Sequence, residues 1–170
     1  EVILYGYCLW GKEIFSKLQG MFAIGIWDKN NEELILARDH IGKKPLYYSW
    51  DGGILLFASE IKGILAHKEH NRECNLEAIH HYLTFQYVPS PFSAFKGIKK
   101  IPPATFLSFN KNGEINEYKY WQLPPPQKQK SRPLEEIQIE LKEKLEDAIK
   151  LRMISDVPVG AFLSGGVDSS

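Results

Sequence analysis

The sequence predicts an α+β domain followed by the beginning of an α/β domain. Three observations support this prediction. Short apolar runs separated by turn residues fill most of residues 21–121, consecutive prolines interrupt the chain at 124–126, and a helical pattern then leads into an apolar run and a glycine-rich loop. We therefore expect a first domain at residues 1–121, a linker at 122–133 and the start of a second domain at 134–170.

The charge balance and the cysteine content narrow the class of protein. The 21 basic and 21 acidic residues cancel, so the chain lacks the charge of a nucleic-acid or anionic-membrane binder. Its apolar runs are shorter than the ~20 residues of a membrane span. Cys8 and Cys74 are too few for a disulfide framework and indicate a reducing compartment. We expect a soluble, cytoplasmic protein with small-molecule or protein partners.

The first domain begins with two short helices and continues with strands. Apolar residues recur at spacings of three and four up to residue 18, with a break at Gly11. Cys8 lies in this pattern, and we interpret it as a small core residue. Apolar runs at 21–27 and 34–37 predict a hairpin buried on both faces, and runs at 46–50 and 54–58 predict a second hairpin. We expect these four strands to share one sheet.

Two helices and a third hairpin complete this domain. Helical spacing is seen at 61–65 and again at 76–83, where Asn75 precedes the helix as a candidate cap. We expect both helices to pack on a sheet face. The segments 105–109 and 115–121 bracket an Asn-Lys-Asn-Gly turn, which indicates another hairpin.

After the linker, an apolar stripe predicts a helix that begins at Leu134 and carries acidic residues in its first turn. Residues 159–163 are all apolar or glycine and predict a short strand of the kind found in parallel sheets. The loop Ser-Gly-Gly-Val-Asp-Ser-Ser at 164–170 follows directly, at the place where α/β folds bind ligands.

The loop has the features of a phosphate site. Gly165 and Gly166 let the backbone approach a phosphate, and successive N–H groups ahead of a helix form an anion site. Asp168 would repel phosphates unless a divalent cation lay between them, so it predicts Mg²⁺. Gly166 also stands where a P-loop needs lysine, which disfavours that motif. The simpler alternative is a glycine turn whose serines cap a helix.

Longer runs in the sequence resemble a known family. Residues 155–170, Ser-Asp-Val-Pro-Val-Gly-Ala-Phe-Leu-Ser-Gly-Gly-Val-Asp-Ser-Ser, are similar to the pyrophosphatase-type ATP loop of glutamine-hydrolysing asparagine synthetases. Gly-Met-Phe-Ala at 20–23 and Ala-Arg-Asp-His-Ile-Gly-Lys-Lys-Pro-Leu-Tyr-Tyr at 37–48 resemble the class II glutamine amidotransferase domain of the same enzymes. Residues 58–62 and 82–89 also fit, so the resemblance spans nearly the whole chain.

This resemblance implies a fold. Residues 1–121 would be the C-terminal part of an N-terminal-nucleophile amidotransferase domain, which is an αββα sandwich. Residues 134–170 would be the first helix, strand and loop of an adenine-nucleotide-binding domain with a parallel sheet.

The resemblance also implies a ligase of asparagine biosynthesis. In that family the β-carboxylate of aspartate attacks the α-phosphorus of ATP, giving β-aspartyl-AMP and Mg-pyrophosphate, and ammonia from glutamine then displaces AMP. The implied small molecules are aspartate, glutamine, ATP and Mg²⁺. The oligomeric state, a homodimer included, stays open.

By the same resemblance, the ATP site lies in the loop. Leu163 would lie against the adenosine, chiefly through its backbone, and Asp168 would be the Mg²⁺ ligand. The residues implied at the pyrophosphate site are Ser164, Gly165, Gly166, Val167, Asp168, Ser169 and Ser170.

The family's glutaminase nucleophile is an N-terminal cysteine whose own α-amino group is the base. The sequence begins with Glu1, so we expect no catalytic glutaminase residue within it. We interpret the chain as an internal fragment that is inactive alone, and an incomplete gene record as the reason.

Four residues of the first domain are candidates for a functional role. Met21 resembles a residue that lines the family's ammonia tunnel, although we expect its main role to be packing. Arg38, Asp39 and Lys44 look catalytic in isolation, but we expect them to form an ion-paired scaffold.

Two alternative functions stay open. The chain could belong to another amidotransferase-ligase of the same architecture, such as a β-lactam synthetase-like or sugar-amidating enzyme. It could also belong to a non-catalytic scaffold, although the intact ATP loop argues against that.

Overall fold

The computed structural model describes residues 1–126 and 132–167. The chain divides into two compact units, Glu1–Pro124 and Pro125–Ser170, and each is described by itself. The first unit mixes helices with antiparallel sheets, which confirms the α+β class expected for this part of the chain.

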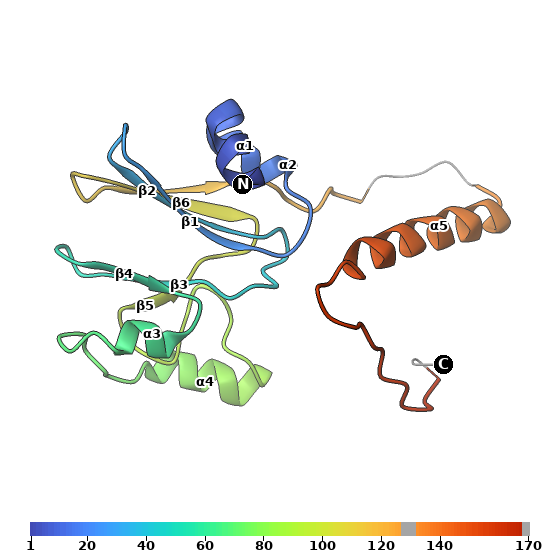
Figure 1. The fold of residues 1–170 in the computed structure, drawn as a ribbon. Coiled ribbons are helices and arrows are strands. Elements are labelled where there is room, and N and C mark those ends of the chain that lie inside the picture. Colours follow the sequence, from blue (N-terminus) through green and yellow to red (C-terminus); the bar gives the residue numbers. More distant parts are fainter. Residues whose placement is uncertain (127–131, 168–170) are drawn as a thin grey trace. The chain divides into compact units, whose positions relative to one another are not determined.

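The first unit contains two antiparallel sheets (Figure 1). The larger one has the order β1-β2-β6-β7, with β1 at Ala23–Asp28, β2 at Glu33–Arg38, β6 at Thr105–Asn110 and β7 at Ile115–Lys119. The smaller one has the order β4-β3-β5, with β3 at Tyr47–Trp50, β4 at Leu55–Ala58 and β5 at Ile98–Lys100.

The prediction that the first four strands share one sheet was wrong. The hairpin β1-β2 belongs to one sheet and the hairpin β3-β4 to the other. The cause is long-range pairing: the free edge of β2 is taken by β6, and that of β3 by β5. Local apolar patterns identify strands but carry no information on partners so far along the chain.

Helices cover the outer faces of both sheets. The helices α1 (Val2–Trp10) and α2 (Ile14–Lys17), joined by the 3₁₀ turn η1 (Gly11–Glu13), lie over the larger sheet, as the sequence predicts for a helix pair broken at Gly11. The helices α3 (Ile61–Leu65) and α4 (Leu76–Phe85) lie beyond the smaller sheet (Figure 1). The unit therefore has the layer order helices, sheet, sheet, helices.

The core has two parts because β2 is buried on both faces. Ile35 and Ala37 point to a cluster under α2, where the rings of Phe15 and Phe106 lie 5.3 Å apart. Leu36 points to the other side, into a cluster with four further residues, Leu46, Ile101, Leu107 and Phe109. The expectation of a hairpin buried on both faces holds only for β2, because β1 is an edge strand whose Trp27 is 60% exposed.

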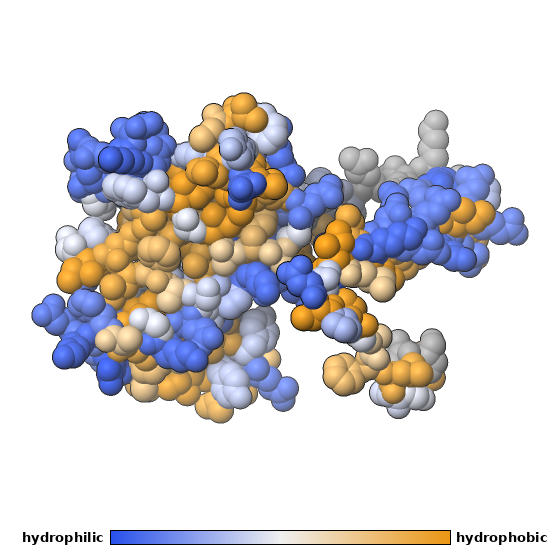
Figure 2. Space-filling view, in the orientation of Figure 1, coloured by the Kyte–Doolittle hydropathy of each residue, from blue (hydrophilic) through white to orange (hydrophobic). Residues whose placement is uncertain are grey.

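Local capping signals in the sequence are confirmed, whereas one burial prediction is wrong. The side chain of Asn75 accepts the N–H of Ala78 at 3.3 Å and so caps α4. Cys8, expected in the core, is exposed. It lies on α1, which buries only Gly6 and leaves most of its apolar side chains at the surface, where Figure 2 shows orange, apolar surface.

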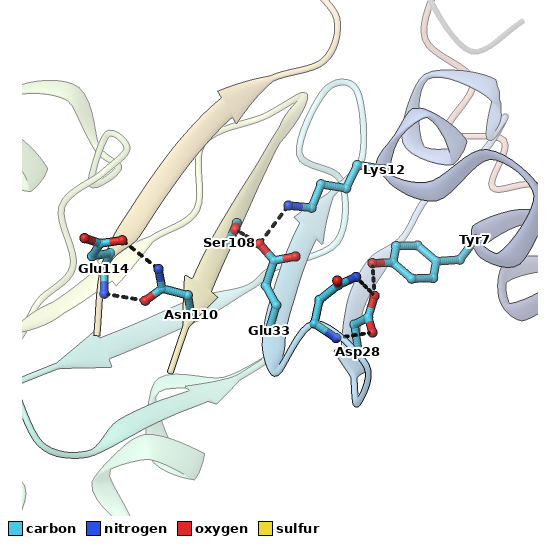
Figure 3. Close-up of polar contacts among 8 residues, drawn as sticks. Tyr7, Lys12, Asp28, Glu33, Ser108, Asn110 and Glu114 are labelled. Atoms are coloured by element: carbon cyan, nitrogen blue, oxygen red, sulfur yellow. Dashed lines mark hydrogen bonds and ion pairs between the residues drawn. The ribbon is translucent and has the colours of Figure 1, made fainter. Parts of the chain in front are cut away.

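Polar side chains attach the first helices to the larger sheet (Figure 3). The hydroxyl of Tyr7 donates to the carboxylate of Asp28 at 2.9 Å. The ammonium of Lys12 lies 2.7 Å from Glu33 on β2, and the hydroxyl of Ser108 on β6 donates to the same carboxylate. These bonds connect α1 and η1 to strands that are far apart in the sequence.

In its described residues, the second unit is one long helix followed by chain without regular secondary structure. The helix α5 runs over Leu134–Arg152, with Glu135 and Glu136 in its first turn and basic residues in its last turn, as complements to the helix dipole. On its surface Lys144 pairs with Glu140 at 3.0 Å.

The strand predicted at 159–163 is not formed. A strand needs a neighbouring strand to pair its backbone N–H and C=O groups, and the described residues of this unit contain no such neighbour. Its apolar residues, Phe162 among them, are exposed. Among the described residues of the whole chain, no helix has the length and apolar character that crossing a membrane requires.

Candidate functional site

The described part of the glycine-rich loop, residues 164–167, forms an open turn. Gly165 has a φ of +75°, a conformation that residues with a Cβ rarely adopt. The N–H of Gly166 points at the hydroxyl oxygen of Ser164, 3.4 Å away. Leu163 and Val167, on either side, are exposed. The structure therefore brings Ser164, Gly165 and Gly166 into one turn.

The remaining residues implied at the ATP site, Asp168, Ser169 and Ser170, lie outside the described residues. A β-carbon added at Gly165 would meet nothing within 4 Å. The turn is therefore open at Gly165, where a backbone without a β-carbon lets a phosphate approach closely.

A cavity of about 640 Å³ lies in the same unit, next to the chain that precedes this turn. It separates the last turns of α5 from the chain at residues 159–161. The lining residues are Leu145, Ala148, Ile149, Arg152, Met153, Val159, Gly160 and Ala161. Most of them are apolar, and Arg152 is a cation that the sequence analysis did not single out. Its only signal in the sequence is its place in the last helical turn.

Met21 lines a second cavity, in the first unit. This cavity has a volume of about 520 Å³, and its lining residues are Ile3, Met21, Phe22, Ala23, Ile24, Lys44, Pro45 and Ser59. The side chain of Met21 is 50% exposed, so it is not the packing residue that we expected. It belongs to the wall of an open space, which we call the Met21 cavity.

Asp39 lies in the turn after β2 and is almost completely buried, with 1% of its surface exposed. Its carboxylate accepts four backbone N–H groups, from Phe22 at 3.3 Å, Ile41 at 3.3 Å, Lys43 at 2.9 Å and Lys44 at 2.9 Å. Burial alone would raise the pKa of this carboxyl, but the four hydrogen bonds outweigh burial and lower the pKa below its usual value.

Arg38 binds three backbone carbonyl groups, two of them in the same turn. Its guanidinium donates to the carbonyl oxygens of Lys44 at 2.8 Å, Gly42 at 2.7 Å and Ile101 at 2.7 Å. The scaffold role expected for Arg38, Asp39 and Lys44 is present, but the expected ion pairing is wrong. The two charges are held by backbone groups, and within the described residues no ion pair joins them.

Comparison with protein families gives two matches in chain order. Residues 1–121 match the family described as glutamine amidotransferase domain. Residues 140–170 match the family described as asparagine synthase. The first match contains the Met21 cavity and the Arg38–Asp39 turn, and the second contains the glycine-rich loop.

Curated relatives match over the whole chain. A putative glutamine-hydrolysing asparagine synthetase of Methanocaldococcus jannaschii is 44% identical over all of this chain and 33% of its own length. A glutamine-hydrolysing asparagine synthetase of Bacillus subtilis is 38% identical, with 26% of its own length covered. The amidase chry2 of Gibberella zeae is 34% identical, with 25% covered.

The chain thus spans about a quarter to a third of the length of these relatives. The resemblance to glutamine-hydrolysing asparagine synthetases is confirmed by the two family matches and by the names of the relatives. By the match that covers most of its residues, this chain belongs to the glutamine amidotransferase domain family, and it continues into a segment of the asparagine synthase family.

Proposed function

We propose that the protein is a glutamine-dependent asparagine synthetase, which amidates aspartate at the expense of ATP with ammonia taken from glutamine. The observation that carries this proposal is the presence of both family matches in one chain, in the order found in relatives that bear this name. An amidotransferase domain supplies ammonia and a ligase domain consumes it, so the presence of both in one chain supports a single overall reaction.

The first unit is the ammonia-producing domain in this proposal. Its layer order of helices, sheet, sheet and helices agrees with the αββα sandwich implied for an N-terminal-nucleophile amidotransferase. The Met21 cavity is the open space through which ammonia leaves. Met21 suits that role because its thioether binds neither protons nor ammonia strongly, so ammonia can pass along it without being held.

The second unit begins the ATP domain. The described turn suits the pyrophosphate part of ATP, because Gly165 has a positive φ and open space around it, so a phosphate can approach the backbone closely there. Leu163 lies against the adenosine in this proposal. Asp168 would hold Mg²⁺, which neutralises charge on the departing pyrophosphate; that residue lies outside the described part of the chain.

The reaction balances with these groups. A β-carboxylate oxygen of aspartate attacks the α-phosphorus of ATP, the bond from that phosphorus to the bridging oxygen breaks, and pyrophosphate leaves with the electron pair. The nitrogen of ammonia then attacks the acyl carbon of β-aspartyl-AMP, AMP leaves, and the nitrogen loses a proton. The role of the turn is to stabilise charge on the leaving pyrophosphate.

One observation favours a second candidate. The amidases chry2 of Gibberella zeae and chyE of Penicillium rubens are 34% and 36% identical to the whole of this chain. The same two matched segments therefore occur in proteins that bear another name. The alternative is an amidotransferase-ligase that uses an acceptor other than aspartate.

The test is an assay of the full-length protein with ATP, Mg²⁺, glutamine and aspartate, in which pyrophosphate and asparagine are measured together. Equal amounts of both, lost in Asp168→Ala, support the proposal. Pyrophosphate that appears only with another carboxylate acceptor indicates the alternative ligase. If neither product forms with any acceptor, the protein is a scaffold and the proposal is wrong.

A further inference from the structure

One buried carboxylate connects two separate segments of the wall of the Met21 cavity. The Oδ2 atom of Asp39 accepts the N–H of Phe22 at 3.3 Å and the N–H of Lys44 at 2.9 Å. Phe22 and Lys44 both line the cavity, Phe22 just before β1 and Lys44 in the turn after β2. The carboxylate thus connects two parts of the chain that are 22 residues apart at these positions.

Phe22 is held through both of its backbone polar groups. Its N–H donates to the carboxylate of Asp39, and its carbonyl accepts the backbone N–H of the same residue at 3.0 Å. Asp39 is in turn fixed by its own carbonyl, which accepts the N–H groups of Gly42 at 3.1 Å and Ala104 at 2.9 Å. Asp39 is therefore itself held by its own turn and by the segment before β6.

The chemistry of these bonds makes the anchor stiff. Hydrogen bonds to an ionised carboxylate are about twice as strong as neutral ones, and burial keeps water from competing for them. All four donors are backbone groups, so the carboxylate sets the path of the main chain and not only the position of side chains.

We propose that Asp39 is a positioning residue that sets the width of the Met21 cavity by fixing Phe22 and Lys44. This inference rests on the proposed function for what the cavity carries, which is ammonia. If the wall moves, ammonia escapes to water before it reaches the acceptor. The consequence is a loss of coupling between glutamine hydrolysis and amide formation, while the chemistry at either end is intact.

Asp39→Asn is the sharpest variant. It keeps the shape of the side chain but replaces one oxygen by an NH₂ group, so two N–H donors face another donor. The readout is the amount of glutamate formed per asparagine in the full-length protein. We expect this ratio to rise at least about threefold. This is a modest effect, since misplacing reacting groups by an ångström can cost about 100-fold in rate. The rate with ammonium in place of glutamine should stay near that of the unmodified protein.

Asp51→Asn is the matched control. Asp51 also accepts backbone N–H groups in a turn, from Gly53 at 2.9 Å and Ile54 at 2.8 Å between β3 and β4, but both bonds end on Oδ1, an oxygen that asparagine keeps. The same substitution there removes a charge without removing a bond. Asp51 does not line the Met21 cavity. A role in stability alone predicts equal ratios in the two variants, whereas the proposal predicts a rise only in Asp39→Asn.

A second variant covers the case in which Asp39→Asn does not fold. Gly42→Ala leaves the carboxylate in place but strains the same turn, because Gly42 has a φ of +68° and a β-carbon there would lie 3.0 Å from Arg38 and from Pro103. It should raise the ratio in the same direction. An unchanged ratio in whichever of the two variants folds would overturn the proposal.

A measurement without activity separates this inference from the proposed function. Amide hydrogen exchange at Phe22 and Lys44 should become at least about tenfold faster in Asp39→Asn, and unchanged in Asp51→Asn. If the unmodified protein makes no asparagine but these amides respond, the proposed function fails and the positioning role stands. If the amides do not respond, the positioning role is wrong whatever the protein synthesises.

Discussion

The guanidinium group of Arg38 donates a 2.7 Å hydrogen bond to the backbone carbonyl of Ile101, which lies 63 residues later in the chain. The same group binds the carbonyls of Gly42 and Lys44. One side chain at the end of β2 thus fixes the following turn and the segment before β6. A planar fork with several donors can serve three carbonyls at once, and a single ammonium group cannot reach the same geometry.

Arg38→Lys should therefore destabilise the first unit. At least one of the three carbonyls loses its partner, so we expect a loss of about 2–3 kcal/mol in the free energy of unfolding. All four tryptophans, Trp10, Trp27, Trp50 and Trp121, belong to the first unit, so tryptophan fluorescence during urea unfolding reports on this unit alone. The matched control is Arg72→Lys, because Arg72 is exposed and donates to one carbonyl, that of Leu65. Equal losses in the two variants would contradict the account.

The stability of the first unit should fall in acid partly through Asp39. Its pKa is lowered in the folded state relative to the ordinary value of 3.8, so the folded state favours the ionised form. A depressed pKa contributes stability that is present above the unfolded value and is lost as the pH falls through the folded value. Urea midpoints should therefore drop below about pH 4.

Asp39→Asn should flatten this pH dependence, measured as the difference in urea midpoint between neutral and acidic buffer. The dependence should not vanish, because hydrogen bonds also lower the pKa values of Asp28 and Asp51. A variant with the full pH dependence of the unmodified protein would show that the Asp39 carboxyl is not linked to folding.

Glu33 provides a test of how burial changes the value of an ion pair. Lys12 lies 2.7 Å from Glu33, whose side chain is only 14% exposed. Lys12→Met should cost about 1–2 kcal/mol, between the value of a surface pair and that of a broken buried pair, because Glu33 keeps only Ser108 as a side-chain partner in Figure 3.

The matched control is Lys62→Met. Lys62 and Glu60 lie just as close, at 2.6 Å, but both side chains are mostly exposed. No measurable change in the urea midpoint is expected there. If both variants lose equal stability, the burial of Glu33 does not matter and the interpretation of the Figure 3 cluster is wrong.

The sequence predicts those parts of the fold that depend on neighbouring residues. Asn75 was identified as a cap from its place before an apolar helical run, and its side chain accepts the N–H three residues on. The turn between β3 and β4 was expected from the two apolar runs at 46–50 and 54–58, and its geometry adds the carboxylate of Asp51, which accepts the N–H groups of Gly53 and Ile54. Such contacts span few residues, so their signals lie within one short window.

Features that depend on distant partners were missed. The pairing of β2 with β6 sets Leu36 opposite Leu107, and no local pattern specifies that pairing. The exposure of Cys8 is of the same kind, since a helical pattern shows which residues share a face but not what covers the face.

The same difference between features set by neighbouring residues and features set by distant partners is seen at the candidate site. The glycine-rich loop was found from its residue types, and its turn is present at Gly165. Asp39 was noticed as a charged residue, but its partners are backbone N–H groups, which every sequence contains at every position except proline. Sequence patterns therefore suggested an ion pair with Arg38, where the structure shows main-chain anchoring.

Gly165→Ala tests whether the turn in the second unit binds ATP. Gly165 has a φ of +75°, and alanine in this region costs about 1–2 kcal/mol. If the turn must keep its shape to bind the pyrophosphate part of ATP, the KM for ATP should rise about 5- to 30-fold, since 1.4 kcal/mol is a factor of ten. The measurement is pyrophosphate release by the full-length protein against ATP concentration.

Gly160→Ala is the control, because it isolates the backbone conformation. A β-carbon at Gly160 also meets nothing within 4 Å, but Gly160 is not among the residues with positive φ. The two substitutions add the same methyl group to equally open positions, and only one of them strains the turn. An unchanged KM for ATP in Gly165→Ala, or an equal rise in both variants, would show that the conformation of this turn does not determine nucleotide binding, and the phosphate site would then have to lie elsewhere in the protein.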